Sequence, residues 1–357
     1  MDTAVIPNLS SEQTESLCRE LDEIRARILD DLGERDADYM REVIRTQRGL
    51  ELVGRGLLFF SLIPPAWLGG VVALSLSKIL ENMEIGHNVM HGQYDWTNDP
   101  ELDGTSFEWD NACPGELWRH SHNYIHHTYT NVLGKDRDVG YGVLRMSEEQ
   151  PWNPYYLGNP LYAALLAIFF QYGVALHDLE VDRILAGETT LGEKRELLRA
   201  IERKARQQTL KDYVLFPLLS GPSAPLVLAG NATANLVRNL WAFTIIFCGH
   251  FPDGTVQFTE AEMAEETRGQ WYYRQLLGSA DLTGGKLLHV LSGHLSHQIE
   301  HHLFPDLPAN RYSEIAVEVR EICRRYELPY NTGPLVRQFG SVVRKIARFA
   351  LPSRAGS

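Results

Sequence analysis

Three short histidine-rich stretches decide what this chain can be: His87-Asn-Val-Met-His91, His122-Asn-Tyr-Ile-His126-His127 and His297-Gln-Ile-Glu-His301-His302. Each contains two histidines four positions apart, a spacing that places two imidazole rings on one face of a helix. Neutral imidazole is the commonest side-chain metal ligand. Eight histidines in three such clusters are too many for one ion. The sequence therefore predicts a centre that holds two metal ions.

The first apolar stretch, residues 54–80, lies just before the first cluster. Pro64 and Pro65 must interrupt a helix there, because proline lacks the backbone N–H that a helix needs. We expect a hairpin whose second arm continues into His87 and His91. Each arm is short compared with the roughly 20 residues that cross a bilayer.

The second apolar stretch, residues 213–250, predicts another pair of arms, 213–229 and 232–250, separated near Gly230 and Asn231. Both arms are almost free of charge, as expected of membrane-spanning segments. With the first hairpin they predict four crossings.

Whether a third apolar stretch, residues 154–177, crosses the membrane can be decided by counting the crossings between the clusters. If the clusters form one site, they share one side of the membrane, so an even number of crossings separates His127 from His297. The basic run within 178–211 obeys the positive-inside rule only if it is cytoplasmic. We therefore expect residues 154–177 to form an interfacial or re-entrant helix.

Composition and the N-terminal pattern limit the remaining possibilities. The chain has 357 residues and a net charge of −12, which argues against nucleic acid as a partner. In residues 11–48, Leu17, Leu21, Ile24 and Ile28 recur at helical spacing among charged residues. This pattern predicts one amphipathic helix that packs on its own protein; a membrane-surface anchor is the alternative.

The three clusters resemble the histidine boxes of the integral-membrane fatty acid desaturases, which have the forms HxxxH, HxxxHH and (H/Q)xxHH. The matching residues are 87–91, 122–127 and 298–302. The run Gln298-Ile-Glu-His301-His302-Leu-Phe-Pro305 is similar to the third box of the front-end subgroup, in which Gln replaces the first His. The resemblance covers roughly residues 50–330.

With the apolar pattern, the resemblance implies an all-α fold. We expect an integral membrane bundle of four transmembrane helices in two hairpins, with a cytosolic helical cap that holds a polyhistidine di-iron site. The expected divisions are a cytosolic N-terminal region (1–48), the desaturase domain (49–330) and a cytosolic C-terminal tail (331–357).

The resemblance also implies a ligand set, because the family places a further histidine at the end of the last span, where His250 lies. The expected ligands are His87, His91, His122, His126, His127, His250, Gln298, His301 and His302. Gln298 competes with His297, which lies about 100° round the helix from it. The expected hydrogen-bonding neighbours of the ligands are His120, His294, His297, Glu84, Asp138 and Glu300. We expect His177 and His289 to be ordinary residues.

The implied reaction is the O₂-dependent introduction of a cis double bond into a fatty acyl chain, either a CoA thioester or a lipid. Breaking an unactivated C–H bond needs a strong oxidant, which redox-inert zinc cannot generate but two iron ions with imidazole ligands can. Since no His-Pro-Gly-Gly motif of a fused cytochrome b5 domain occurs, electrons are expected from a separate ferredoxin- or cytochrome-type donor with its reductase.

The resemblance further implies contact with membrane lipid, in a bacterial cytoplasmic membrane with the active site facing the cytoplasm. Two alternatives stay open. A related di-iron membrane hydroxylase would act on an alkane, a lipid or a carotenoid, although the run His302-Leu-Phe-Pro305 favours an acyl desaturase. A non-enzymatic zinc-binding membrane receptor would bind zinc in place of iron.

Overall fold

The computed structural model describes residues 9–177, 179–185 and 187–353. Within these ranges the regular secondary structure is almost entirely helical, which confirms the all-α prediction. The named strands of the described part, β1 (Asp281–Thr283) and β2 (Thr332–Pro334), form one short parallel pair.

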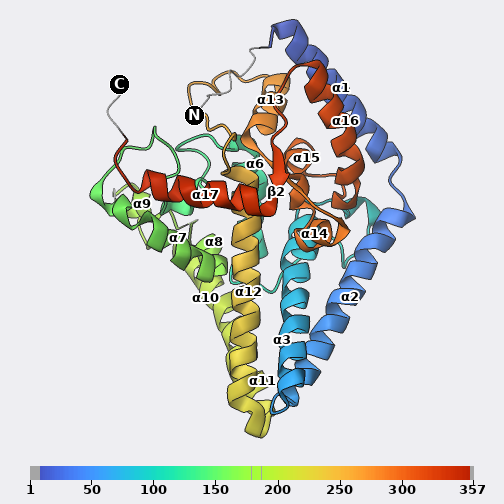
Figure 1. Cartoon of the computed structure of the whole chain (residues 1–357), viewed down its shortest axis with the longest axis vertical. Helices are drawn as coiled ribbons and strands as arrows, with labels where there is room; N and C mark the ends of the chain where they lie inside the picture. Colours follow the sequence, from blue (N-terminus) through green and yellow to red (C-terminus); the bar gives the residue numbers. More distant parts are fainter. Residues whose placement is uncertain (1–8, 178, 186, 354–357) are drawn as a thin grey trace.

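The first hairpin consists of α2 (Glu34–Phe59) and α3 (Pro64–Ile79), which run side by side along the long axis of the molecule (Figure 1). Pro64 and Pro65 occupy the first turn of α3, where a missing N–H costs nothing. Gly54 lets the two arms approach closely, because a Cβ there would lie 2.8 Å from the backbone nitrogen of Leu74. The predicted hairpin is confirmed.

The second hairpin turns at a different place from the predicted one. α12 (Ala224–His250) runs unbroken through Gly230 and Asn231. The turn lies instead at the 3-10 segment η7 (Gly221–Ser223), where Gly221 has a φ of +56°. The arm before the turn has three consecutive parts, α10 (Arg195–Thr209), the π-helical η6 (Leu210–Leu215) and α11 (Phe216–Leu219). Asn231 does not break α12, because its side chain bonds Arg55 and the Asp212 carbonyl.

The predicted N-terminal helix is two helices. α1 (Ser11–Asp30) ends before Gly33, whose extended backbone caps α2 while its N–H donates to the Asp36 carboxylate. The apolar face of α1, which includes the fully buried Leu17 and Leu21, packs against the helices α13 (Arg268–Gly278) and α16 (Tyr312–Arg325). The prediction that this segment packs on its own protein is confirmed.

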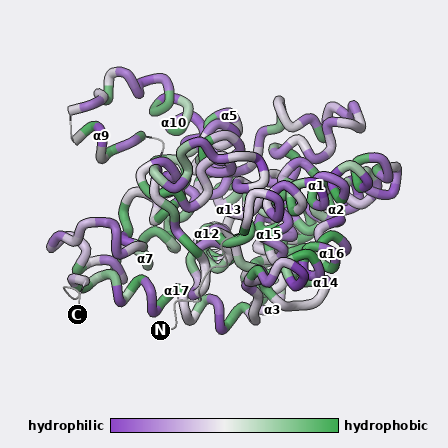
Figure 2. Tube along the Cα trace, turned by 90° about the horizontal axis from the view of Figure 1, so that it is seen from above, coloured by the Kyte–Doolittle hydropathy of each residue, from purple (hydrophilic) through white to green (hydrophobic). Residues whose placement is uncertain are grey.

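Shorter elements connect these helices and gather at the end of the molecule away from the hairpin turns (Figure 1). They are η1 (Leu80–His87), α4 (Asn88–Met90), η2 (Asp95–Thr97), α5 (Gly115–Trp118), η3 (Arg119–His126), α6 (His127–Tyr129), η4 (Gly140–Gly142), η5 (Pro154–Gly158), α7 (Asn159–Ile168), α8 (Phe170–His177), α9 (Val181–Leu185), α13 (Arg268–Gly278), α14 (Lys286–Leu291), η8 (Leu295–His297), α15 (Gln298–Leu303), η9 (Ala309–Arg311), α16 (Tyr312–Arg325) and α17 (Leu335–Phe349). Seen from above, α12 lies at the centre with other helices around it (Figure 2).

The apolar stretch that ends at His177 is sharply bent. Residues Pro154–Ile168 and Phe170–His177 meet at an angle of 102°, and together they have the length and composition of a membrane span. No single helix of the described ranges has both by itself.

The packing of α1 can be tested with a matched pair of leucine substitutions. Leu21→Ala removes a fully buried side chain from the core between α1, α13 and α16, so we expect the free energy of unfolding to fall by about 3 kcal/mol. Leu29→Ala, at a position 38% exposed on the same helix, should have a much smaller effect. Thermal unfolding of the purified variants measures both, and equal midpoints would contradict the packing described here.

Candidate metal centre

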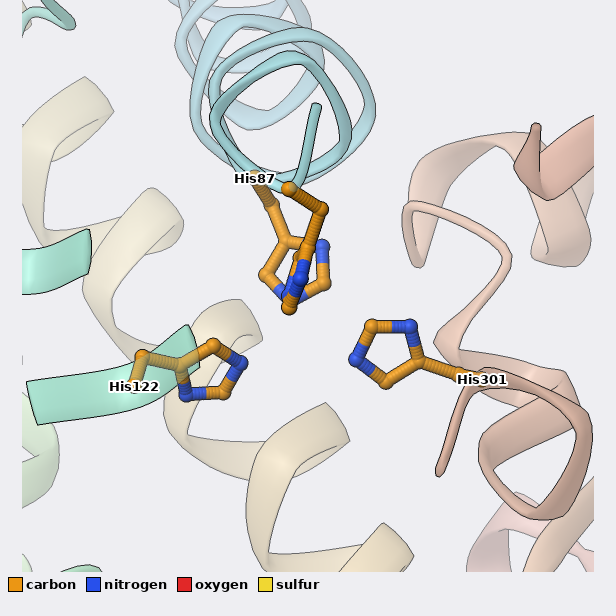
Figure 3. A group of neighbouring side chains, drawn as sticks. His87, His122 and His301 are labelled. Carbon is orange, nitrogen blue, oxygen red and sulfur yellow. The ribbon is translucent and has the colours of Figure 1, made fainter. Parts of the chain in front are cut away.

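The three histidine clusters meet at the end of the molecule to which α3 and α12 both lead. The rings of His87, His122 and His301 come from three separate segments and point toward one common space (Figure 3). Two of these segments, η1 and η3, are π-helical. Such wider turns recur at functional sites, because they displace side chains from the positions that an α-helix imposes.

The ring nitrogens form overlapping groups in which all candidate ligand atoms lie within 4.8 Å of one another. One group consists of His87, His91, His122 and His301. A second consists of His126, His250 and His302, and a third of His127, His301 and His302. All eight predicted histidine ligands thus belong to one continuous cluster.

The hydrogen bonding of these rings fits metal ions. Seven of them have a buried Nε2 atom without a hydrogen-bond partner: His87, His91, His122, His126, His127, His301 and His302. A buried polar atom without a partner is costly, and native proteins contain few of them. Seven such atoms in one place are readily explained by cations that accept their lone pairs.

In the first two clusters, neighbouring side chains contact the opposite nitrogen of three rings, those of His87, His126 and His122. His87 Nδ1 lies 3.0 Å from Asn88 Oδ1, and His126 Nδ1 lies 3.0 Å from both carboxylate oxygens of Asp136. His122 Nδ1 lies 3.6 Å from Asp138 Oδ2. Such contacts fix the tautomer and the ring orientation of a metal-binding histidine. Asp138 therefore lies where it was expected.

The third cluster is held by residues that sequence reasoning missed. His302 Nδ1 lies 3.0 Å from Gln275 Oε1, and His301 Nδ1 lies 3.3 Å from the Tyr312 hydroxyl. Gln275 lies on α13 and Tyr312 begins α16, so neither belongs to a histidine cluster. Nothing in the local sequence distinguishes them from ordinary helix residues.

Burial keeps most of these imidazoles neutral. Desolvation, with the nearby His122, lowers the pKa of His87 to about 3, and desolvation holds the pKa values of His91 and His301 well below the usual range. At His126, desolvation also opposes protonation, but Asp136 and Asp138 outweigh it and raise the pKa. Neutral rings have the free lone pair that a metal requires.

Gln298 and His297 face different surroundings. Gln298 Nε2 lies 3.0 Å from His250 Nε2, and its buried Oε1 has no hydrogen-bond partner. Gly249 leaves room for this amide, because a Cβ there would lie 2.8 Å from Gln298 Cδ. His297 Nε2 instead lies 3.0 Å from the Ser313 hydroxyl.

His297 belongs to a separate polar group with Asp281 and Glu300. Its Nδ1 lies 3.8 Å from a carboxylate oxygen of each. The hydroxyl of Tyr330 donates to this carboxylate pair. Glu300 therefore contacts Tyr330, Asp281 and His297 rather than the ring of a predicted ligand.

Three other expected neighbours lie elsewhere. His120 is exposed and stacks on Tyr124, so its position does not support a role beside a ligand. His294 Nδ1 lies 3.0 Å from Glu84, which also accepts a hydrogen bond from Tyr39. Glu84 and His294 thus bond each other and Tyr39 rather than the ligand rings.

A cavity adjoins the cluster. Its lining includes His87, His122, His250 and Gln298. Its apolar lining consists of Met83, Trp109, Trp118, Tyr141, Phe170, Val174, Ala242, Ile246 and Leu295. Polar side chains, among them Asn82, Gln171 and Asn239, also line it. An apolar chain in this cavity would lie against the histidine rings.

His177, expected to be an ordinary residue, also lines this cavity. Its Nε2 lies 3.3 Å from Asp138 Oδ1. A contact with a carboxylate that faces two predicted ligands contradicts the expectation that His177 is ordinary.

The third cluster offers a direct test. Gln298→Leu removes the amide that faces His250, so we expect loss of most activity and of one metal ion per chain. His297→Gln keeps a polar side chain of similar reach, so it should preserve the metal content. Metal analysis beside an activity assay distinguishes the two. An inactive His297→Gln with an active Gln298→Leu would reverse the ligand assignment.

Comparison with known proteins identifies the family of this chain. The fatty acid desaturase family profile matches residues 64–334. The NADPH-dependent stearoyl-CoA 9-desaturase of Mycobacterium tuberculosis is 48% identical over 357 residues, covering 99% of this chain and 84% of that protein. The sn-1 linoleoyl-lipid 6-desaturase of Synechocystis sp. is 27% identical over 78% of this chain and 79% of the relative. This chain therefore belongs to the fatty acid desaturase family and is an oxidoreductase that desaturates fatty acyl chains.

Proposed function

We propose that the enzyme introduces a cis double bond at position 9 of a saturated acyl-CoA, at a di-iron centre held by the histidine cluster. The observation that carries the proposal is the set of seven unpartnered Nε2 atoms beside an apolar cavity. The position and the CoA thioester follow the name of the Mycobacterium tuberculosis relative.

The stoichiometry determines what must reach the site. Two hydrogen atoms leave the acyl chain, and with two electrons from a donor and two protons they reduce O₂ to two water molecules. Bound iron would supply the redox chemistry that activates O₂. The name of the relative points to NADPH as the source of electrons, passed through a separate ferredoxin- or cytochrome-type donor and its reductase.

The residues of the chain hold and orient the reactants. The four rings of His87, His91, His122 and His301 would hold one ion. His126, His127, His250, His302 and Gln298 would hold the other. The apolar cavity holds the acyl chain against the rings and excludes bulk water, so the bond to be oxidised is positioned before reaction. The hydroxylase alternative is not favoured, because the relatives described above are desaturases by name.

We also propose that the two hairpins cross a bacterial cytoplasmic membrane four times, with the metal centre on the cytoplasmic side. Both hairpin turns lie at the end of the molecule opposite the cluster (Figure 1). Around the hairpins, many large apolar side chains are exposed, including Leu52, Phe60, Leu62, Leu68, Val72, Leu215, Leu218, Leu219, Leu228 and Leu236. Soluble surfaces rarely carry so extensive an apolar area, which lipid would cover.

The bend between α7 and α8 supports an interfacial place for residues 154–177. A segment that turns by 102° halfway along does not extend straight across a bilayer. With this segment in the interface, the number of crossings between His127 and His297 is even, as one shared site requires.

Metal analysis with histidine variants tests the proposed centre. We expect about two iron ions per wild-type chain. His302→Ala removes a ring from two of the ligand groups, so activity should fall more than about 100-fold, beyond the usual effect of losing a ligand's hydrogen-bonding neighbour. The exposed His120→Ala is the matched control and should retain activity. A fully active His302→Ala, or a wild-type enzyme that desaturates without iron, would refute the centre.

Substrate and position are tested by feeding purified enzyme stearoyl-CoA, NADPH and a donor system, then mapping the double bond by mass spectrometry. We expect a cis product at position 9. A hydroxylated product would favour the alternative reaction. A double bond elsewhere would show that position does not follow the similarity to this relative.

Cysteine labelling tests the four crossings. Leu62→Cys and Pro222→Cys lie in or next to the two hairpin turns, at exposed positions. Lys135→Cys and Arg195→Cys lie on the side of the cluster. In a Cys18→Ser background, we expect an impermeant thiol reagent to label the first pair only from outside and the second pair only from inside. Labelling of Pro222→Cys and Arg195→Cys from the same face would show that α10–α11 does not cross.

A further inference from the structure

We propose that His177, which lies outside all three histidine clusters, positions the metal-binding rings of the second cluster through Asp138. The inference rests on the proposed metal centre and adds a residue that the resemblance does not supply. His177 ends α8, about 50 positions beyond the second cluster.

Asp138 connects His177 to two predicted ligands. Its Oδ2 lies 3.6 Å from His122 Nδ1 and 3.7 Å from His126 Nδ1. Its Oδ1 lies 3.3 Å from His177 Nε2. One oxygen therefore faces the ligand rings while the other faces His177, and the Asp138 side chain is only 10% exposed. Holding one oxygen restricts the rotation of the whole carboxylate.

His177 is itself held in place. Its Nδ1 lies 2.6 Å from the carbonyl oxygen of Val174, one turn earlier in α8, and its side chain is 4% exposed. Its ring centroid lies 5.6 Å from that of Tyr141. Its Nε2 lies 3.3 Å from Asp138 Oδ1. The Val174 carbonyl can only accept, so Nδ1 donates to it, and Nε2 also donates to Asp138 when the ring is the doubly protonated imidazolium. His177 belongs to none of the candidate ligand groups. Its geometry is that of a positioning residue and not of a ligand.

The two ligands depend on Asp138 to different degrees. His126 also contacts Asp136, at 3.0 Å, and the backbone N–H of Asn131 holds that second carboxylate. For His122, Asp138 is the carboxylate within reach. A loss of His177 should therefore disturb His122 more than His126, and the effect should be partial rather than complete.

The contact also connects the substrate cavity with the metal centre. Phe170, Val174 and His177 all lie on α8, and all three line the cavity together with Asp138. One helix thus provides part of the wall for the acyl chain and, at its last residue, the group that holds Asp138. Substrate position and ligand orientation are set by the same element.

Two isosteric substitutions separate the two contacts of the ring. His177→Gln places its amide nitrogen near the position of Nε2 and can still donate to Asp138. His177→Asn places its amide nitrogen near Nδ1 and can only reach the Val174 carbonyl. We expect His177→Asn to lower kcat about tenfold and to release iron faster to a ferrous chelator, the range found when a hydrogen-bonding neighbour of a ligand is lost. In His177→Gln, kcat and the rate of iron release should both stay near the wild-type values. The opposite pattern, or no change in either variant, would overturn the proposal.

A double-mutant cycle then tests whether the effect passes through Asp138. Asp138→Asn alone should slow turnover and weaken iron retention, and adding His177→Asn should change either by less than about twofold, because residues that act through one contact are not additive. Losses that multiply would show independent roles and overturn the proposal. A wild-type enzyme without iron would instead refute the metal centre, whereas an active, iron-loaded wild type with an unchanged His177→Asn refutes only the role of His177.

Discussion

The fold depends on one constraint, the burial of many imidazole nitrogens in one place. A buried polar atom without a partner costs free energy, and seven Nε2 atoms converge here. The protein stabilises the opposite edges of five of these rings with Asn88, Asp136, Asp138, Gln275 and Tyr312. Only the inner edges are left for metal ions. The rest of the structure keeps these rings at fixed positions.

Short-range sequence patterns predicted that the histidine clusters meet, but they predicted the ends of the helices less well. Histidine spacing and the Pro64–Pro65 pair are short-range signals, and both led to correct elements. The break predicted at Asn231 was wrong because contacts distant in sequence satisfy its amide inside α12. For the same reason the contacts of Gln275 with His302 and of His177 with Asp138 were missed, since they join residues that only the fold brings together.

The glutamine of the third cluster bears on whether a short motif indicates the position of the double bond. This chain has Gln at the first position of QIEHH, yet it is 48% identical to a protein named as a 9-desaturase and 27% identical to one named as a 6-desaturase. In the structure, this glutamine places its amide nitrogen 3.0 Å from His250 Nε2. Under the proposed function, the position of the double bond depends on how far the acyl chain enters the cavity before it meets the rings.

A buried group of ion pairs fixes the axial position of one hairpin relative to the other. Asp212 accepts from Arg55 at 2.7 Å, from Lys78 at 2.8 Å and from Asn235 at 3.0 Å, so one carboxylate joins α2, α3 and α12. Charges buried among apolar helices are costly unless paired, and Asp212 is paired with both Arg55 and Lys78. Because α3 leads into the first cluster and α12 ends at His250, a shift of one helix along the other would separate the rings. Asp212 thus stabilises the metal centre from a distance, by keeping both helices in register.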